Sequence, residues 1–160
     1  MIKKRNVFNG VWNESSHGEK FQREHMALTD MREGHALGCG AFRVAPGKRA
    51  FPKHAHLGND EAVFIIAGSG TLVVGSDETT VAAGDFVMLP RGSDLAHVLI
   101  NSGEDDLLYL CMSTMNAPEV VHYPDSGKLG VMEDSRNWQG GNSISGFYRT
   151  EKAGYYDGED

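Results

Sequence analysis

A series of strand-like runs of hydrophobic residues follows one after another through the middle of the chain. Short turn sequences separate them, among them Pro46-Gly47 and Pro90-Arg91-Gly92, and proline and glycine are the residues that tight turns select. Short strands at spacings of about ten residues are typical of an all-β sandwich or barrel. The runs lie at residues 37–45, 62–67, 71–75, 79–82, 86–89, 96–101 and 106–113.

The two ends of the chain differ from this middle part. Residues 1–36 are largely polar, with one strand predicted near 20–28, and residues 117–160 are rich in glycine and acidic side chains. We therefore predict a single barrel at 37–116, an N-terminal arm with the first strands at 1–36, and an irregular C-terminal arm at 117–160. That C-terminal arm carries many aromatic residues, so we expect it to lie on the barrel or on a second subunit.

Within the barrel, residues 62–67 are apolar at every position rather than at alternate ones. Successive side chains of a strand point to opposite faces of its sheet. The run therefore predicts a strand that is covered on both sides.

Two histidines and a glutamate stand just before this run. His54 and His56 are two residues apart, so on a strand both imidazoles lie on the same face. Residues 57–60 have the composition of a turn, and Glu61 follows it. Two imidazole nitrogens and a carboxylate oxygen can therefore converge on a divalent transition metal. The alternative is that the histidines are ordinary half-buried side chains and Glu61 a solvated acid.

A second motif lies further along the chain, and the pair of motifs resembles that of the cupin superfamily. In the second motif five, one, four and three residues separate Gly84, Pro90, Gly92, His97 and Asn101. The first motif maps onto Gly47, His54, His56, Glu61 and Gly68. The sequence departs from the family pattern by one extra residue before His54 and two extra residues before His97.

The resemblance implies a single cupin jelly-roll barrel with a metal held by His54, His56, Glu61 and His97. The metal would be Fe, Mn, Ni, Zn, Co or Cu, because imidazole and carboxylate ligands suit all of these ions. Four protein ligands on an octahedral ion leave positions for substrate, water or dioxygen. Val63 and Ile65 share the facing of Glu61, which predicts an apolar wall beside the metal.

Other residues are candidates for contact with a substrate. The stretch from Ala36 to Leu57 has no acidic residue, and its Arg43 and Arg49 are candidate contacts for an anion. The alternative is a solvated basic face. Tyr109 on the last long strand is a candidate catalytic acid, base or hydrogen-bonding group, and the alternative for it is a packed aromatic residue.

Charge and composition restrict the partners and the compartment. The net charge of −7 argues against nucleic acid as the main partner, and no apolar run reaches the length of a membrane span. No apolar segment typical of a signal peptide follows the basic N-terminus. Cys39 and Cys111 fit reduced, buried thiols better than a disulfide. Together these features predict a cytoplasmic protein.

The resemblance and the composition together predict a metal-binding cupin that acts on a small oxygenated, anionic molecule. The layout resembles small stand-alone bacterial cupins described as sugar-phosphate-isomerase-like. Two alternatives remain open: an iron-dependent dioxygenase and a non-catalytic cupin that binds or senses a small ligand. A homodimer is also expected, since cupin sheets commonly pair across subunits and exposed sheet edges need cover.

Overall fold

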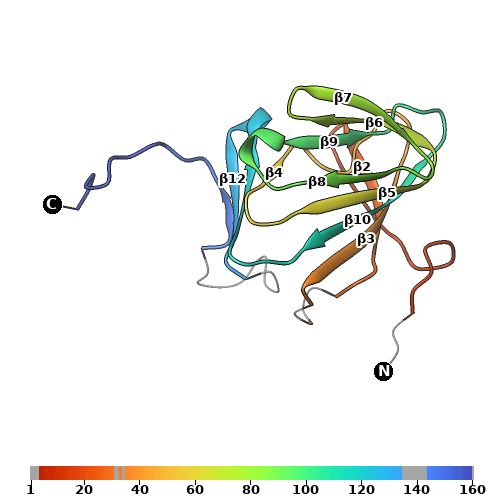
Figure 1. Ribbon diagram of the computed structural model, residues 1–160, viewed down its shortest axis with the longest axis horizontal. Helices are drawn as coiled ribbons and strands as arrows, with labels where there is room; N and C mark the ends of the chain where they lie inside the picture. Colours follow the sequence, from red (N-terminus) through yellow and green to blue (C-terminus); the bar gives the residue numbers. More distant parts are fainter. Residues whose placement is uncertain (1–3, 31–32, 34, 135–143, 160) are drawn as a thin grey trace.

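The computed structural model describes residues 4–30, 33, 35–134 and 144–159, and the regular secondary structure within them is almost entirely β-strand (Figure 1). The strands are β1 (Asn13–His17), β2 (Phe21–Ala27), β3 (Leu37–Val44), β4 (Ala55–His56), β5 (Glu61–Ala67), β6 (Ser69–Val74), β7 (Asp77–Ala82), β8 (Phe86–Leu89), β9 (His97–Ile100), β10 (Leu107–Thr114), β11 (Glu119–Tyr123), β12 (Lys128–Met132) and β13 (Gly146–Tyr148). Two short 3₁₀ turns, η2 (Ser93–Leu95) and η3 (Pro124–Ser126), interrupt them.

The strands form three open sheets. The largest has six strands in the order β1-β2-β3-β10-β5-β8, a second has the order β13-β12-β11-β4, and the third has the order β7-β6-β9. The all-β class predicted from the sequence is confirmed, but the sheets do not close into the predicted barrel. The six-stranded and three-stranded sheets are held together by side chains packed between them rather than by a continuous hydrogen-bonded ladder.

The core lies between these two sheets. Alternation along the strands places one set of side chains inside, as with Val63 and Ile65 of β5, which are buried while Phe64 between them is exposed. Each such buried aliphatic or aromatic side chain stabilises the fold by about 1.5–3 kcal/mol. The buried cluster consists of Phe42, Val44, Ala50, Val63, Ile65, Leu72, Val81, Leu89, Leu107 and Tyr109.

Gly68 forms the corner at which the chain leaves the six-stranded sheet and enters the three-stranded one. Its φ angle is 79°, a left-handed conformation that favours glycine. A Cβ atom at this position would lie 2.5 Å from the carbonyl oxygen of Asp106. Any larger residue would therefore clash with the backbone next to β10, which explains the glycine at the end of the first motif.

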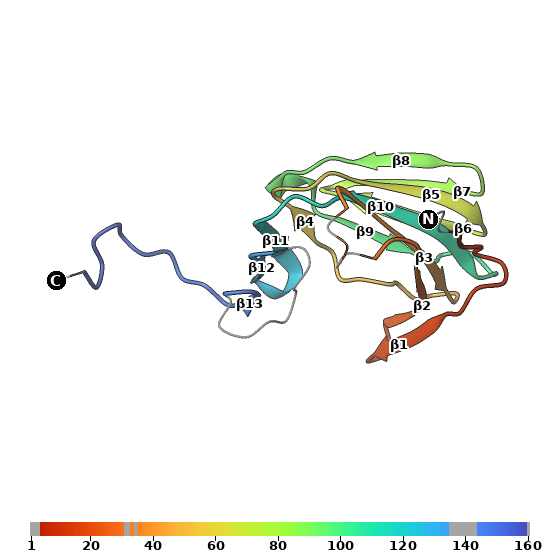
Figure 2. The same ribbon diagram turned by 90° about the horizontal axis from the view of Figure 1, so that it is seen from below.

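The ends of the chain are more regular than the sequence predicted. Residues 13–17 form β1, which pairs with β2 in a hairpin, and β11 and β12 pair with each other. The prediction of an irregular C-terminal arm was therefore wrong for residues 119–132. It fits residues 149–159 better, because this last segment runs away from the sheets (Figures 1 and 2).

The state of the cysteines and the question of a membrane-spanning helix bear on two predictions from the sequence. Cys39 and Cys111 are both free thiols. Within the described residues, no helix has the length and apolar character needed to cross a membrane.

Candidate metal centre

The strands β4, β5 and β9, with the residues that precede β4, bring the predicted metal ligands to one place. His54 and His97 lie opposite each other in an isolated antiparallel bridge, with hydrogen bonds of 3.0 Å from the His54 N–H and 2.7 Å from the His97 N–H to the other residue's carbonyl. His56 ends β4, and Glu61 begins β5. The two extra residues before His97 are absorbed in the 3₁₀ turn η2, after which β9 starts at His97 itself.

The three imidazoles converge on a single carboxylate oxygen. The Nε2 atoms of His97, His56 and His54 lie 3.0, 3.4 and 3.9 Å from Oε2 of Glu61. Ligand atoms about 2.1 Å from one ion lie about 3 Å apart when they are neighbours and about 4 Å apart when they are opposite. These three distances have the spacing of ligand atoms around one ion.

The other ring nitrogens of the histidines all face oxygen atoms. Nδ1 of His54 donates to the Pro52 carbonyl at 2.8 Å, and Nδ1 of His97 lies 3.4 Å from the Leu95 carbonyl. Nδ1 of His56 lies 3.7 Å from Oε1 of Glu119. A histidine that donates through Nδ1 presents its Nε2 lone pair to a metal, and metal-binding histidines have this arrangement. The donor set therefore fits a transition metal.

His97 differs slightly from the other three residues. The donor atoms of His54, His56 and Glu61 all lie within 4.8 Å of one another, and they form the candidate metal-binding set among the residues that the structure describes. His97 reaches the same Glu61 oxygen but is not part of this set. Its place as a fourth ligand therefore rests on the contact with Glu61.

Glu119 is a site residue that the sequence reasoning missed. Its side chain is 1% exposed, and its Oε1 accepts hydrogen bonds from the backbone N–H groups of Leu57 and Gly58 at 3.0 and 3.2 Å. Its Oε2 accepts from the side-chain amide of Asn59. Glu119 therefore fixes the turn between His56 and Glu61 while facing His56. The one available signal was an acid at the start of the apolar run Val120-Val121.

The charges of the site are strongly coupled. Burial lowers the pKa of His56, but the nearby carboxylates of Glu119 and Glu61 outweigh it and raise that pKa to about 9. Burial, with the neighbouring His97, lowers the pKa of His54 to about 4. Burial opposes ionisation of Glu61, yet its contacts with His56 and His97 hold its pKa well below the usual range. Without metal, the proton at neutral pH therefore resides on His56, and the ring of His54 is neutral.

Further side chains surround the carboxylate and the rings. The thiol of Cys111 donates to Oε1 of Glu61 at 3.6 Å, so both oxygens of Glu61 are engaged. Tyr123 stacks on His54 with ring centroids 5.9 Å apart. Tyr109 is buried and stacks on Phe42 at 5.5 Å, and burial raises its pKa well above the ordinary value. Cys111 and Tyr123 were not expected at this site from the sequence.

A cavity of about 330 Å³ lies beside these residues. His54, His56, Glu61 and His97 all line it, and so does Tyr109. Of the residues expected to form its apolar wall, Val63 lines it, whereas Ile65 is packed in the core instead. The structure thus brings the four predicted metal ligands and Tyr109 to one cavity.

The two arginines predicted to contact an anion do not line this cavity. Arg43 pairs with Glu24 through an Nη1–Oε2 contact of 2.7 Å, and its guanidinium lies over the ring of Trp12 at 4.7 Å. Arg49 takes part in backbone pairing with Phe21 and Ile100. Neither arginine therefore joins the candidate metal site.

Comparison with known proteins identifies the class to which this fold and site belong. Residues 40–113 match the family model described as a cupin domain, a segment that contains all four predicted metal ligands. Residues 40–113 therefore match a cupin domain, in agreement with the resemblance that the two motifs predicted. Comparison with curated protein sequences gives no match.

Solved structures support the fold along most of the chain. A candidate sugar phosphate isomerase from Acidithiobacillus ferrooxidans is 26% identical, with a TM-score of 0.73 over 87% of this chain and 89% of that one. A cupin-superfamily sugar phosphate isomerase from Silicibacter pomeroyi is 23% identical, with a TM-score of 0.70 over 98% and 94%. A predicted oxalate decarboxylase from Thermotoga maritima is 21% identical, with a TM-score of 0.59 over 68% and 96%.

Proposed function

We propose that this protein is a metal-dependent cupin enzyme that acts on a small oxygenated molecule. The observation that carries the proposal is the convergence of three Nε2 atoms on one oxygen of Glu61, at distances of 3.0–3.9 Å, in the wall of a cavity. His54, His56 and Glu61 would hold the ion, with His97 as the fourth ligand. A divalent metal bound there supplies a Lewis acid that polarises an oxygen atom of the substrate.

The side chains around the ligands would orient and protect them. The Pro52 carbonyl holds the ring of His54 through Nδ1, and Glu119 faces Nδ1 of His56. Cys111 donates to the second oxygen of Glu61, which leaves Oε2 directed at the histidines. These contacts limit rotation of the ligands, and such restraint raises metal affinity.

Tyr109 is the proposed acid of the site. It lines the same cavity as the histidines, and because burial raises the pKa of its hydroxyl, this group remains protonated at neutral pH. A protonated hydroxyl can donate a hydrogen bond to a substrate oxygen or deliver a proton to a neighbouring carbon. Of the reactions expected from the sequence, proton transfer in an isomerase needs such a group most directly.

The test is a survey of turnover with protein loaded separately with Fe, Mn, Ni, Co, Cu and Zn. The substrates would include sugar phosphates, hydroxy acids and keto acids, and oxygen consumption would be followed for the iron form. Turnover that needs metal and falls in Tyr109→Phe supports the proposal. Oxygen uptake by the iron form would indicate a dioxygenase instead. Ligand binding without turnover would indicate a non-catalytic binding protein.

A further inference from the structure

The cavity beside the candidate metal centre is apolar over most of its wall. Aromatic rings and sulfur atoms make up much of this surface, contributed by Phe42, Phe51, Tyr109, Tyr123, Cys111 and Met115. Aromatic and thioether groups make favourable contacts with apolar and aromatic ligands. The ionisable groups of the metal site, His54, His56, Glu61 and His97, line part of this wall, and His25, Thr29 and Ser113 add further polar groups.

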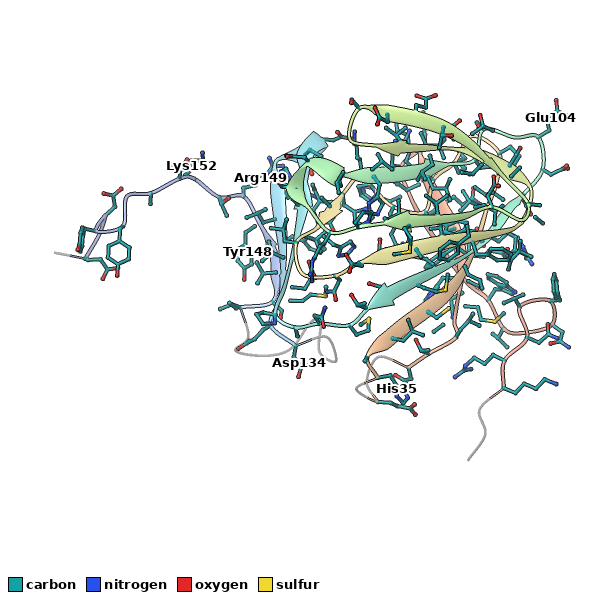
Figure 3. The ribbon with its side chains drawn as sticks, viewed as in Figure 1. His35, Glu104, Asp134, Tyr148, Arg149 and Lys152 are labelled. Atoms are coloured by element: carbon teal, nitrogen blue, oxygen red, sulfur yellow. The ribbon has the colours of Figure 1, made fainter. Side chains whose placement is uncertain are left out.

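No lysine or arginine lines this cavity in the part of the chain that the structure describes. The cationic side chains of the acid-free stretch contact other groups instead. Arg43 pairs with Glu24. Lys48 and Lys53 each donate a hydrogen bond of 2.6 Å to a backbone carbonyl, that of Glu19 and that of Gly75 respectively. Arg149 directly follows β13, and Lys152 stands further out on the C-terminal segment that runs away from the sheets (Figure 3).

This distribution of charge disfavours a phosphate group. Proteins bind phosphate through charge-assisted hydrogen bonds from arginine, lysine or clustered backbone N–H groups. A phosphate placed against the apolar wall, away from the metal site, would lose its hydration without gaining a lysine or arginine partner, which is costly. Among the described residues Glu61 is the one acid in the wall, and its negative charge opposes that of a phosphate.

The size of the cavity limits the body of the ligand. A cavity of about 150 Å³ accommodates one benzene ring. The present volume of about 330 Å³ is therefore sufficient for a body of about two fused rings or an alkyl group of similar bulk.

We propose that the cavity takes an uncharged molecule with an apolar body of this size and an oxygen donor directed at the three histidines, rather than a phosphate ester. This substrate class rests on the proposed function, because the oxygen donor is assigned to the metal that His54, His56, Glu61 and His97 would hold. It differs from the sugar phosphates in the names of the Acidithiobacillus ferrooxidans and Silicibacter pomeroyi proteins, to which this chain is similar.

The experiment compares two ligands with the same body by titration calorimetry on the metal-loaded protein: naphthol and naphthyl phosphate of the same ring isomer. Naphthol is expected to bind about tenfold tighter or more, because its hydroxyl is uncharged and its rings match the wall. Ribose phosphate is expected to show no heat of binding. Equal or tighter binding of either phosphate, or no binding of naphthol, would overturn the proposal.

A charge variant tests whether the wall sets this preference. Ala27 is exposed at the end of β2 and lines the cavity, so Ala27→Lys adds a cation at its edge without disturbing the core. It is expected to strengthen binding of naphthyl phosphate by about tenfold. Thr80→Lys on the exposed strand β7 adds the same charge elsewhere and is the matched control. An equal response of both variants would contradict the proposal.

Metal content separates this inference from the proposed function. A protein that binds no metal but still prefers naphthol to naphthyl phosphate would reject the metal-dependent function and keep the substrate class. A protein that binds metal and prefers the phosphates would do the reverse.

Discussion

Oε1 of Glu119, at the start of β11, lies 3.7 Å from Nδ1 of His56, at the end of the neighbouring strand β4 in the same sheet. The same oxygen accepts two backbone hydrogen bonds from the turn after His56. Glu119 is almost completely buried, and a buried carboxylate needs such partners to remain ionised. One side chain therefore fixes both the ring of His56 and the turn that leads to Glu61.

Replacement of Glu119 should weaken metal binding without removing a ligand. For Glu119→Gln we predict a loss of metal affinity of about tenfold to a hundredfold, the usual effect of losing an outer partner of a metal-bound histidine. Affinity would be measured by chelator competition at a temperature well below the unfolding transition of the variant.

The matched control for this variant is Glu24→Gln, which removes a partly exposed carboxylate paired with Arg43. Its affinity for metal should equal that of the wild type. Unchanged affinity in Glu119→Gln would show that Glu119 only supports the fold.

His97 needs a separate test, because it contacts Glu61 but is not part of the closest set of donor atoms. We predict that the Cu(II)-loaded protein shows nitrogen coupling from three imidazoles in its electron paramagnetic resonance spectrum. His97→Ala should show coupling from two, and its metal affinity should fall by more than the tenfold to hundredfold expected for loss of an outer partner. Identical spectra for the two proteins would limit the ligands to His54, His56 and Glu61.

Metal binding at neutral pH should release a proton from His56. The pKa of this residue is raised to about 9, so at pH 7 it is protonated, whereas a metal ligand must be unprotonated. His54, with its pKa lowered to about 4, is already neutral and releases none. Affinity should therefore increase with pH, by about tenfold per unit between pH 7 and 9.

Calorimetry in buffers of different ionisation enthalpy would count these protons. We expect about one proton per ion at pH 7 from this residue. Binding heats that do not depend on the buffer would contradict the assignment of the proton to His56.

The outer face of β5 and β8 carries an exposed apolar patch, formed by Phe64, Phe86 and Met88. Phe64 and Phe86 are direct cross-strand neighbours, and their exposed fractions are 36% and 56%. The sequence predicts that residues 62–67 are covered on both sides, yet within one chain the side bearing Phe64 is open. Exposed apolar patches of this kind mark association surfaces, and β8 is also a sheet edge.

The homodimer expected from the sequence remains a prediction, and we propose that it forms through this patch. Light scattering should give the mass of a dimer for the wild type and of a monomer for Phe86→Lys, which places a charge in the patch. Thr80→Lys, with the same charge on an exposed strand outside the patch, should remain a dimer. A monomeric wild type would reject the homodimer, and a dimeric Phe86→Lys would place the interface elsewhere.

Local patterns in the sequence predict the strands of the middle part well. The run before Pro46-Gly47 corresponds to β3, the run after Gly84-Asp85 to β8, and the run after Pro90-Arg91-Gly92 to β9. These strands could be predicted because turn residues and alternation act over only a few positions of the chain. The metal motifs are local in the same sense: His54 and His56 need only strand periodicity, and Glu61 only a short turn.

Long-range pairing could not be predicted from the same patterns. Val121 of β11 pairs with His56 of β4, and this contact brings Glu119 and Tyr123 to the site from a segment predicted to be irregular. Closure of the barrel is a long-range property of the same kind, since it depends on which edge strands meet. The residues that line the cavity also could not be predicted from local patterns. Arg43 and Arg49 were therefore candidate anion contacts on the basis of charge alone.

The metal content of the protein tests the central claim most directly. Protein purified without an affinity tag or chelator would be analysed by elemental mass spectrometry, beside His54→Ala and the control His17→Ala, which changes an exposed histidine of β1. We predict close to one transition-metal ion per chain in the wild type and in His17→Ala, and a large loss in His54→Ala. A wild type without metal, or a His54→Ala variant that retains it, would contradict the proposed centre.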